Sequence, residues 1–220
     1  MNAVGNDISL ITVMALAALL PFVIAVGTCY IKFSVVFTLV RNGLGLQQVP
    51  SNLIANAIAL MLAFFVMQPI IVGLYDNYTT WDRPIDSVQA IVEFMDANLA
   101  DYRAYLLKYS DPQLLAFFER ARLAVGETPA VIEPDQHSMF ALLPAYALSE
   151  LTDAFRIGFY LYLPFVVVDL VVSSILLSLG MMMMSPVTVS APIKLILFVA
   201  MDGWSMISQG LVRQYLDVAA

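Results

Sequence analysis

Two features of the chain could do chemical work, and both lie in its last third. Four methionines stand in a row, Met181, Met182, Met183 and Met184, between an apolar arm that carries Asp169 and a second arm that carries Lys194. A thioether side chain is unbranched and polarizable, so a cluster of them can fill an irregular gap and repack when the gap changes shape. Such a run at the turn between two arms indicates the soft plug of a gated pore. The alternative is a core or lipid-facing cluster, because the chain has 12 Met and is 61% hydrophobic.

The two charges need partners if their arms are helices in an apolar medium. On a helix, Asp169 shares a face with Phe165, and Lys194 shares one with Phe198. An unpaired charge at the centre of a helix in lipid costs about 2.5–3.5 kcal/mol. We therefore expect Asp169 and Lys194 to be paired, most simply with each other. The pair could close within one hairpin or join one copy of the chain to the next, which would build a ring, and the residues alone leave both arrangements open.

The other ionisable residues do not form a catalytic pattern. Asp153 and Arg156 have the three-residue spacing that lets side chains meet on a helix, and we interpret them as a local ion pair. The single cysteine, Cys29, excludes a disulfide within the chain and a cysteine-based metal cluster. The single histidine, His137, lies in a polar stretch, and we interpret it as a solvated loop residue rather than a ligand or base. The sequence holds no phosphate loop, zinc-protease motif or calcium loop. We expect neither a metal nor a cofactor, and we predict that the chain is not an enzyme.

The negative charge is concentrated in one segment. Between Asp76 and Asp135 there are eleven acidic and five basic residues, so this segment carries six of the seven net negative charges. Only 12% of all residues are charged, about half of the ~25% in soluble proteins. The chain therefore belongs in or against a membrane. We predict no nucleic-acid binding, which needs a basic surface.

Four apolar blocks bracket the polar segment, at residues 8–40, 53–75, 157–184 and 187–212. Each has roughly the 20 residues or more that a helix needs to cross a hydrocarbon core. Turns rich in glycine, proline or serine join the first two blocks and the last two. The pattern predicts an all-α fold of membrane-protein type in three segments: an N-terminal helical hairpin at 1–75, a small polar helical insert at 76–140 and a C-terminal helical hairpin at 141–220.

Prolines interrupt these blocks, among them Pro69 in the second, Pro164 in the third and Pro192 in the fourth. A proline removes a backbone donor and kinks a helix. In lipid such a defect is tolerated only where protein or water satisfies the freed groups. We expect two kinked helical hairpins that pack on protein along much of their length.

The polar insert has its own helical pattern. Apolar residues recur at steps of three and four from Val88 to Leu106, which predicts an amphipathic helix. Asp111 before Pro112 predicts the N-cap and first residue of a second helix, and Gly126 predicts its C-terminal cap. The insert is then either a module that packs on a neighbour or a solvated helical lid.

The basic residues predict an orientation. Lys32 and Arg41 flank the turn after the first block. Under the positive-inside rule this turn faces the cytoplasm, and the insert and both termini face outward.

Six segments match, in order, the motifs of one family. They lie at residues 20–33, 40–45, 142–150, 165–170, 179–186 (LGMMMMSP) and 192–194 with 199–204. Together they closely resemble the FliP/SctR family, the core export-apparatus proteins of type III secretion systems. Within that family the chain resembles the injectisome branch of the Inv/Mxi/Spa type.

The resemblance implies an export-gate subunit that forms the entry pore for unfolded effector and needle proteins. Such subunits assemble, typically as five copies with SctS-like and SctT-like subunits, into a helical ring or cone in the bacterial inner membrane. SctU-like and SctV-like subunits, inner-rod and needle proteins, secreted polypeptides and membrane lipid are the further implied partners. Met181 to Met184 match the family's gasket, and Asp169 and Lys194 match a pair that joins neighbouring subunits. The implied protein is multi-pass, with much of the assembled complex on the periplasmic side.

Two functions of other classes stay open. An ion or solute carrier would bind its substrate at a broken helix, although the titratable groups in the apolar blocks are too isolated for a proton relay. A structural anchor would nucleate a larger complex without lining a path through the membrane.

Overall fold

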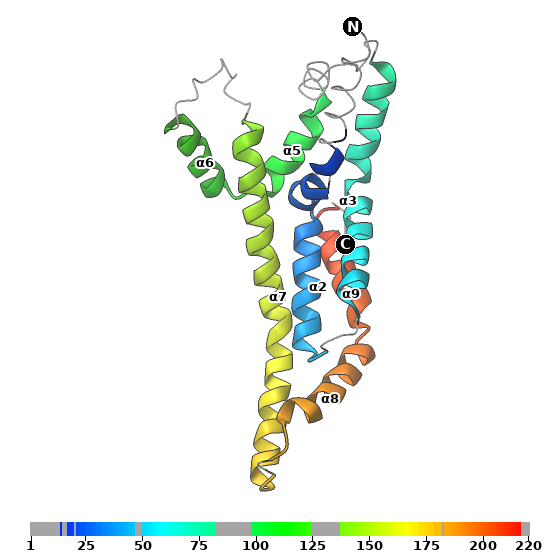
Figure 1. The fold of residues 1–220 in the computed structure, drawn as a ribbon, viewed down its shortest axis with the longest axis vertical. Coiled ribbons are helices and arrows are strands. Elements are labelled where there is room, and N and C mark those ends of the chain that lie inside the picture. The colour runs from blue at the N-terminus through cyan, green and yellow to red at the C-terminus, as the bar shows by residue number, and fades with distance from the viewer. Residues whose placement is uncertain are drawn as a thin grey trace. The chain divides into compact units, whose positions relative to one another are not determined.

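The computed structural model describes residues 14, 17–19, 21–46, 50–81, 98–124, 137–181 and 183–216, and within them the fold is all-α, as predicted. After a short helix at Pro21–Gly27, the labelled helices follow in the order α2 (Tyr30–Gly43), α3 (Asn52–Thr80), α5 (Ala100–Tyr109), α6 (Pro112–Ala124), α7 (Met139–Ser178), α8 (Pro186–Ala200) and α9 (Gly203–Arg213) (Figure 1).

Within the described residues, α3 and α7 are each long and apolar enough to cross a membrane. Up to four spans result if two broken pairs count as one span each, namely Pro21–Gly27 with α2, and α8 with α9, which are bent by 60°. Pro69 and Pro164 lie inside α3 and α7, which continue through them. A proline removes only one backbone donor, and apolar flanks on both sides favour continuing the helix over exposing the chain ends that a break would create.

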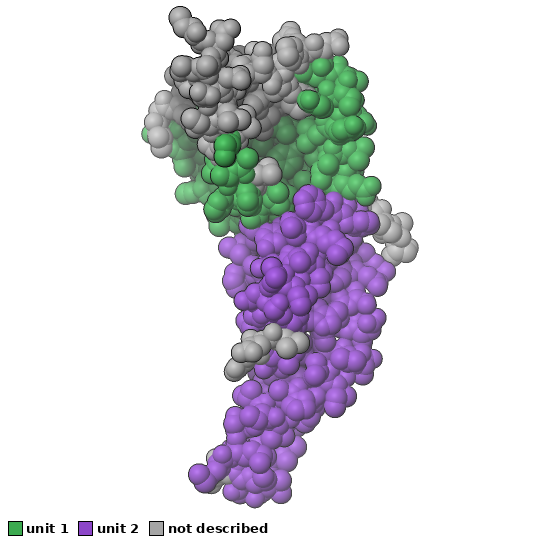
Figure 2. Space-filling view, turned by 45° about the vertical axis from the view of Figure 1, so that its right-hand side comes forward, with its two compact units in different colours: residues 1–29, 67–150 green, residues 30–66, 151–220 purple. Residues whose placement is uncertain are grey.

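The chain forms two compact units, residues 1–29 with 67–150 and residues 30–66 with 151–220 (Figure 2). We call them unit 1 and unit 2 and describe each by itself. The division of the chain into segments 1–75, 76–140 and 141–220 stays a prediction.

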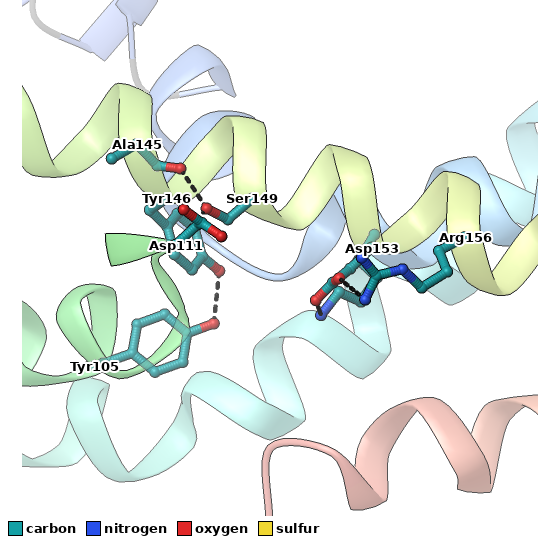
Figure 3. Close-up of polar contacts among 8 residues, drawn as sticks. Tyr105, Asp111, Ala145, Tyr146, Ser149, Asp153 and Arg156 are labelled. Atoms are coloured by element: carbon teal, nitrogen blue, oxygen red, sulfur yellow. Dashed lines mark hydrogen bonds and ion pairs between the residues drawn. The ribbon is translucent and has the colours of Figure 1, made fainter. Parts of the chain in front are cut away.

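The core of unit 1 lies where α5 and α6 pack on the first turns of α7. Its buried apolar residues are Leu106, Leu115, Ala141, Leu142, Ala145 and Tyr146. The hydroxyl groups of Tyr105 and Tyr146 lie 2.7 Å apart (Figure 3), and the Tyr102 hydroxyl donates to the Gly27 carbonyl oxygen at 2.8 Å. Burial raises the pKa of Tyr102 to about 12. Burial first, and then the nearby Cys29 thiol, raises the pKa of Tyr105 as well. Both phenols therefore stay neutral and act as hydrogen-bonding groups.

The start of α6 is built as predicted. Its first residue is Pro112, and the Asp111 Oδ1 atom accepts the backbone N–H groups of Gln113 at 2.8 Å and Leu114 at 3.1 Å. The Asp111 N–H in turn donates to the Ser149 hydroxyl at 2.7 Å, which joins the start of α6 to α7 (Figure 3). Most of the predicted amphipathic helix before α5, residues 88–97, and the predicted cap Gly126 lie outside the described residues.

The core of unit 2 lines the inner face of α2. Phe33, Val36, Phe37 and Val40 are buried there, at the three- and four-residue steps of one helical face. Edge-to-face ring contacts join Phe33 to Tyr215 at 5.8 Å and Phe37 to Trp204 at 5.9 Å between ring centroids. These contacts fix α9 and the turn after it against α2.

Candidate functional site

The Met run lies at the tip of a helical hairpin in unit 2, between α7 and α8. The helix α7 ends in a Schellman motif, in which the Met181 N–H donates to the Leu176 carbonyl and the Gly180 N–H to the Leu177 carbonyl. Gly180 adopts a φ of +75°, which a residue without a Cβ atom reaches at no steric cost. On the other side, Pro186 begins α8, where its missing N–H costs no hydrogen bond. The helix α7 therefore ends just before the methionines, and α8 begins just after them.

The described methionines of the tip are exposed in the single chain. Met183 is fully exposed, and about two-fifths of the surface of Met181 and of Met184 is accessible. Met182 lies outside the described residues. An exposed cluster of large apolar side chains is a surface that another molecule or another copy has to cover. The tip is therefore available to face a path or a partner.

The sequence left Asp169 and Lys194 free to pair within one hairpin or between neighbouring copies, and in the single chain they pair within the hairpin. The Lys194 Nζ atom lies 2.6 Å from the Asp169 Oδ2 atom, and the Ser190 hydroxyl donates to the Asp169 Oδ1 atom at 2.5 Å. The Lys194 ammonium also donates to the carbonyl oxygen of Gly43, at 3.0 Å. Lys194 and Ser190 are buried, whereas about a third of the Asp169 side chain is exposed. The arrangement satisfies both carboxylate oxygens and provides the buried ammonium with two oxygen acceptors.

Aromatic ring contacts also join α7, α8 and α9 near this ion pair. Phe165 of α7 and Phe198 of α8 pack with ring centroids 6.3 Å apart, and Phe198 contacts Trp204 of α9 edge to face at 5.3 Å. Phe165, Leu176 and Phe198 are buried on the helical faces that also carry the two charges. The charged and aromatic contacts together hold α8 against α7.

A second ionic cluster in unit 2 lies nearer the start of α7 than Asp169. The Asp153 carboxylate is 3.7 Å from Arg156 (Figure 3). It is also 3.6 Å from the Lys32 ammonium of α2. Lys32 is buried, and its ammonium lies 4.8 Å from the centroid of the Tyr215 ring. The sequence pattern predicted the Arg156 partner but missed Lys32. The signal was available, because a lone lysine inside an apolar block requires a nearby anion.

Among the described residues, no three His, Cys, Asp or Glu side chains lie together in a way that could hold a metal ion. The Cys29 side chain is buried. The chemistry of the hairpin is thus that of an apolar, deformable tip on a charge-paired base.

The family model described as the FliP family matches residues 11–211. The chain belongs to the FliP family. It is 57% identical to the Surface presentation of antigens protein SpaP of Salmonella typhi, with 98% of this chain and 99% of that protein covered. It is 56% identical to the protein of the same name from Shigella flexneri, at the same coverage. The Yop proteins translocation protein R of Yersinia pestis is 41% identical, with 96% of this chain and 97% of that protein covered.

This FliP-family chain is accordingly of the injectisome type, and it is a component of the export apparatus of a type III secretion system. The family provides a structural part of that apparatus, so the chain works together with other secretion components. Membership in the family and the long apolar helices α3 and α7 make it an inner-membrane protein.

Proposed function

We propose that the chain is a pore-forming export-gate subunit and that Met181 to Met184 form the gasket of the closed pore. The observation that carries the proposal is the exposed thioether tip on a charge-paired, aromatic base. In the single chain the described methionines of the tip have large exposed surfaces, while the base is held by the contacts of Asp169 and Lys194. A soft tip on a rigid base suits a gate, because only the tip has to give way.

The physical basis is the difference between an ion and a polypeptide. A ring of thioether side chains is apolar enough to exclude hydrated ions, as hydrophobic constrictions in channels do. The same side chains are flexible enough to part around an unfolded chain with varied side chains. A ring of this kind needs several copies of the tip around one axis.

We propose five copies, which assemble with SctS-like and SctT-like subunits into a helical cone. SctU-like and SctV-like subunits, inner-rod and needle proteins and the secreted polypeptides are its further proposed partners. Much of the complex would lie on the periplasmic side, with the insert at 76–140 facing away from the cytoplasm. The number of copies, these partners and this placement belong to the proposal.

The gasket is tested by shortening its side chains. Replacing the tip methionines 181–184 with Ala or Gly should make cells permeable to ions and small solutes at rest, while the complex still assembles. Met206→Ala is the matched control, because Met206 is an exposed methionine of α9, outside the tip. A membrane that stays tight in the tip variants, with normal amounts of assembled complex, counts against the gasket.

Crosslinking separates a pore from a structural anchor. A Met183→Cys variant, made with Cys29→Ala so that it is the single thiol, should crosslink to a secretion substrate stalled in the complex. A stalled substrate that never crosslinks to this position, but does so to neighbouring subunits, would favour the anchor. Transport of ions or solutes by the purified chain alone would favour a carrier.

A further inference from the structure

The contacts of Lys194 reach from the hairpin to the end of α2. The carbonyl groups of Val40, Arg41 and Asn42 accept backbone N–H groups of the turn after α2. The next carbonyl, that of Gly43, accepts the Lys194 ammonium at 3.0 Å. The last carbonyl groups of a helix lack intrahelical donors, and a cation there also interacts favourably with the helix dipole. Lys194 therefore caps α2 in addition to pairing with Asp169.

Ser190 fixes the other half of the Asp169 carboxylate. It lies one helical turn before Lys194, on the same face of α8, and it is completely buried. Its hydroxyl donates to Oδ1 at 2.5 Å while Lys194 holds Oδ2 at 2.6 Å. The carboxylate thus receives two donors from α8 and cannot rotate without losing one of them.

Two glycines let the elements approach so closely. A Cβ atom at Gly43 would lie 2.8 Å from the Phe165 ring, which is closer than real contacts allow. A Cβ atom at Gly45, the φ +75° residue of the turn, would lie 3.5 Å from the Cβ atom of Ala191. The turn after α2 therefore lies directly on α8, and the end of α2 lies directly on α7.

The family resemblance implies that Asp169 and Lys194 join neighbouring subunits. We propose instead that Ser190, Lys194 and the Gly43 carbonyl form a clamp within each chain, which holds the α7–α8 hairpin on the turn after α2 and so sets the position of the Met tip. Ser190 is a positioning residue in this clamp. The inference rests on the proposed gate function for the consequence at the tip, but the clamp itself is a contact that can be measured without it.

A disulfide tests directly whether the turn after α2 lies on α8 of the same chain. Gly45→Cys with Ala191→Cys, made with Cys29→Ala, places two Cβ atoms at a separation of 3.5 Å, inside the range of disulfides. Oxidation of the assembled complex in native membranes should give a species with the size of one chain that migrates faster than the reduced chain on a denaturing gel and whose two thiols resist alkylation until it is reduced. A species with the size of two chains, or two thiols that stay open to alkylation, overturns a clamp within the chain.

The role of the clamp at the tip is tested by Ser190→Ala, with leakage expressed per assembled complex. We expect a loss of the tight resting membrane, and Ser190→Thr, which keeps the hydroxyl group, should restore it. The matched control is Ser174→Ala, because the Ser174 hydroxyl donates only to the Leu170 carbonyl of its own helix. A tight membrane in Ser190→Ala, beside leaky tip variants, overturns the positioning role and leaves the gate in place. A tight membrane in the tip variants as well counts against the gate itself.

Discussion

Lys32 and Asp153 form an ion pair whose two ends differ sharply in their access to water. The Lys32 side chain is 3% exposed, whereas that of Asp153 is 48% exposed and also lies close to Arg156. A charge that loses its partner is costly where it stays buried and cheap where solvent reaches it. The two ends of the pair should therefore respond differently to mutation.

We predict that Asp153→Asn lowers the free energy of unfolding by about 2–3 kcal/mol, because it removes the carboxylate from a buried ammonium. Lys32→Met should cost about 1 kcal/mol or less, since Asp153 keeps Arg156 and water and the methionine fills the same space. Thermal denaturation of the detergent-purified protein measures both changes. Arg156→Gln is the control, with an expected loss of about 0.5 kcal/mol or less for an exposed pair. Equal losses for Asp153→Asn and Lys32→Met would contradict this account.

At the scale of the elements, the sequence predicted those features whose causes are local. The cap at Asp111, the helical faces that carry Phe165 with Asp169 and Phe198 with Lys194, and the turn between the last two apolar blocks depend on neighbouring residues, and so they could be predicted from spacing. The need of Asp169 and Lys194 for partners followed in the same way from the cost of a charge in an apolar helix.

What the sequence could not supply were partners set by the register of distant helices. The Ser190 hydroxyl donates to Asp169, 21 positions earlier. A serine in a helix does not by itself indicate a distant hydrogen-bond partner. The Gly43 carbonyl is 151 positions from Lys194, and as a backbone group it leaves no trace in the residue types. Pro69 and Pro164 indicated kinked helices, and their positions alone did not show that α3 and α7 continue through them.

The junction of α8 and α9 depends on the absence of one side chain. Asp202, between the two helices, has a left-handed φ of 51°, and the next residue, Gly203, lies against the Phe198 ring. A Cβ atom there would lie only 2.6 Å from the Phe198 Cζ atom, and that ring is confined by Phe165 and Trp204. The bend between α8 and α9 therefore leaves no room for a side chain at Gly203.

Gly203→Ala should lower the free energy of unfolding by about 1–3 kcal/mol, the usual cost of overpacking a core. Gly210→Ala in the same helix is the control, because nothing lies within 4 Å of its added Cβ atom. It should raise stability by about 0.5–1 kcal/mol, as alanine does in place of glycine inside a helix. The two changes are compared by thermal denaturation, and Phe198→Leu added to Gly203→Ala should recover part of the loss. A neutral Gly203→Ala would show that the Phe198 ring is free to move.

At the scale of the whole molecule, the length of α7 constrains its surroundings. Its 40 residues make a helix about 60 Å long, twice the ~30 Å of a hydrocarbon core. Large apolar residues are exposed along the whole of it, from Phe140 through Phe159 to Leu177. Lipid can cover only about half of this surface, and the rest would face water in an isolated chain.

We therefore predict that protein covers the remaining half of this surface. Mild detergent should then extract the chain from the membrane as a complex of several copies. Native mass measurement of material extracted in mild detergent should give several times the 24.2 kDa of one chain. Single cysteines at Phe140, Phe159 and Leu177, each combined with Cys29→Ala, provide a second measurement. A lipid-soluble thiol reagent should label only the positions at the depth of the hydrocarbon core, and dissociating the complex should expose the others to labelling. A stable single protomer, with the same labelling before and after dissociation, would mean that no protein covers α7 and would remove the basis for a ring of Met tips.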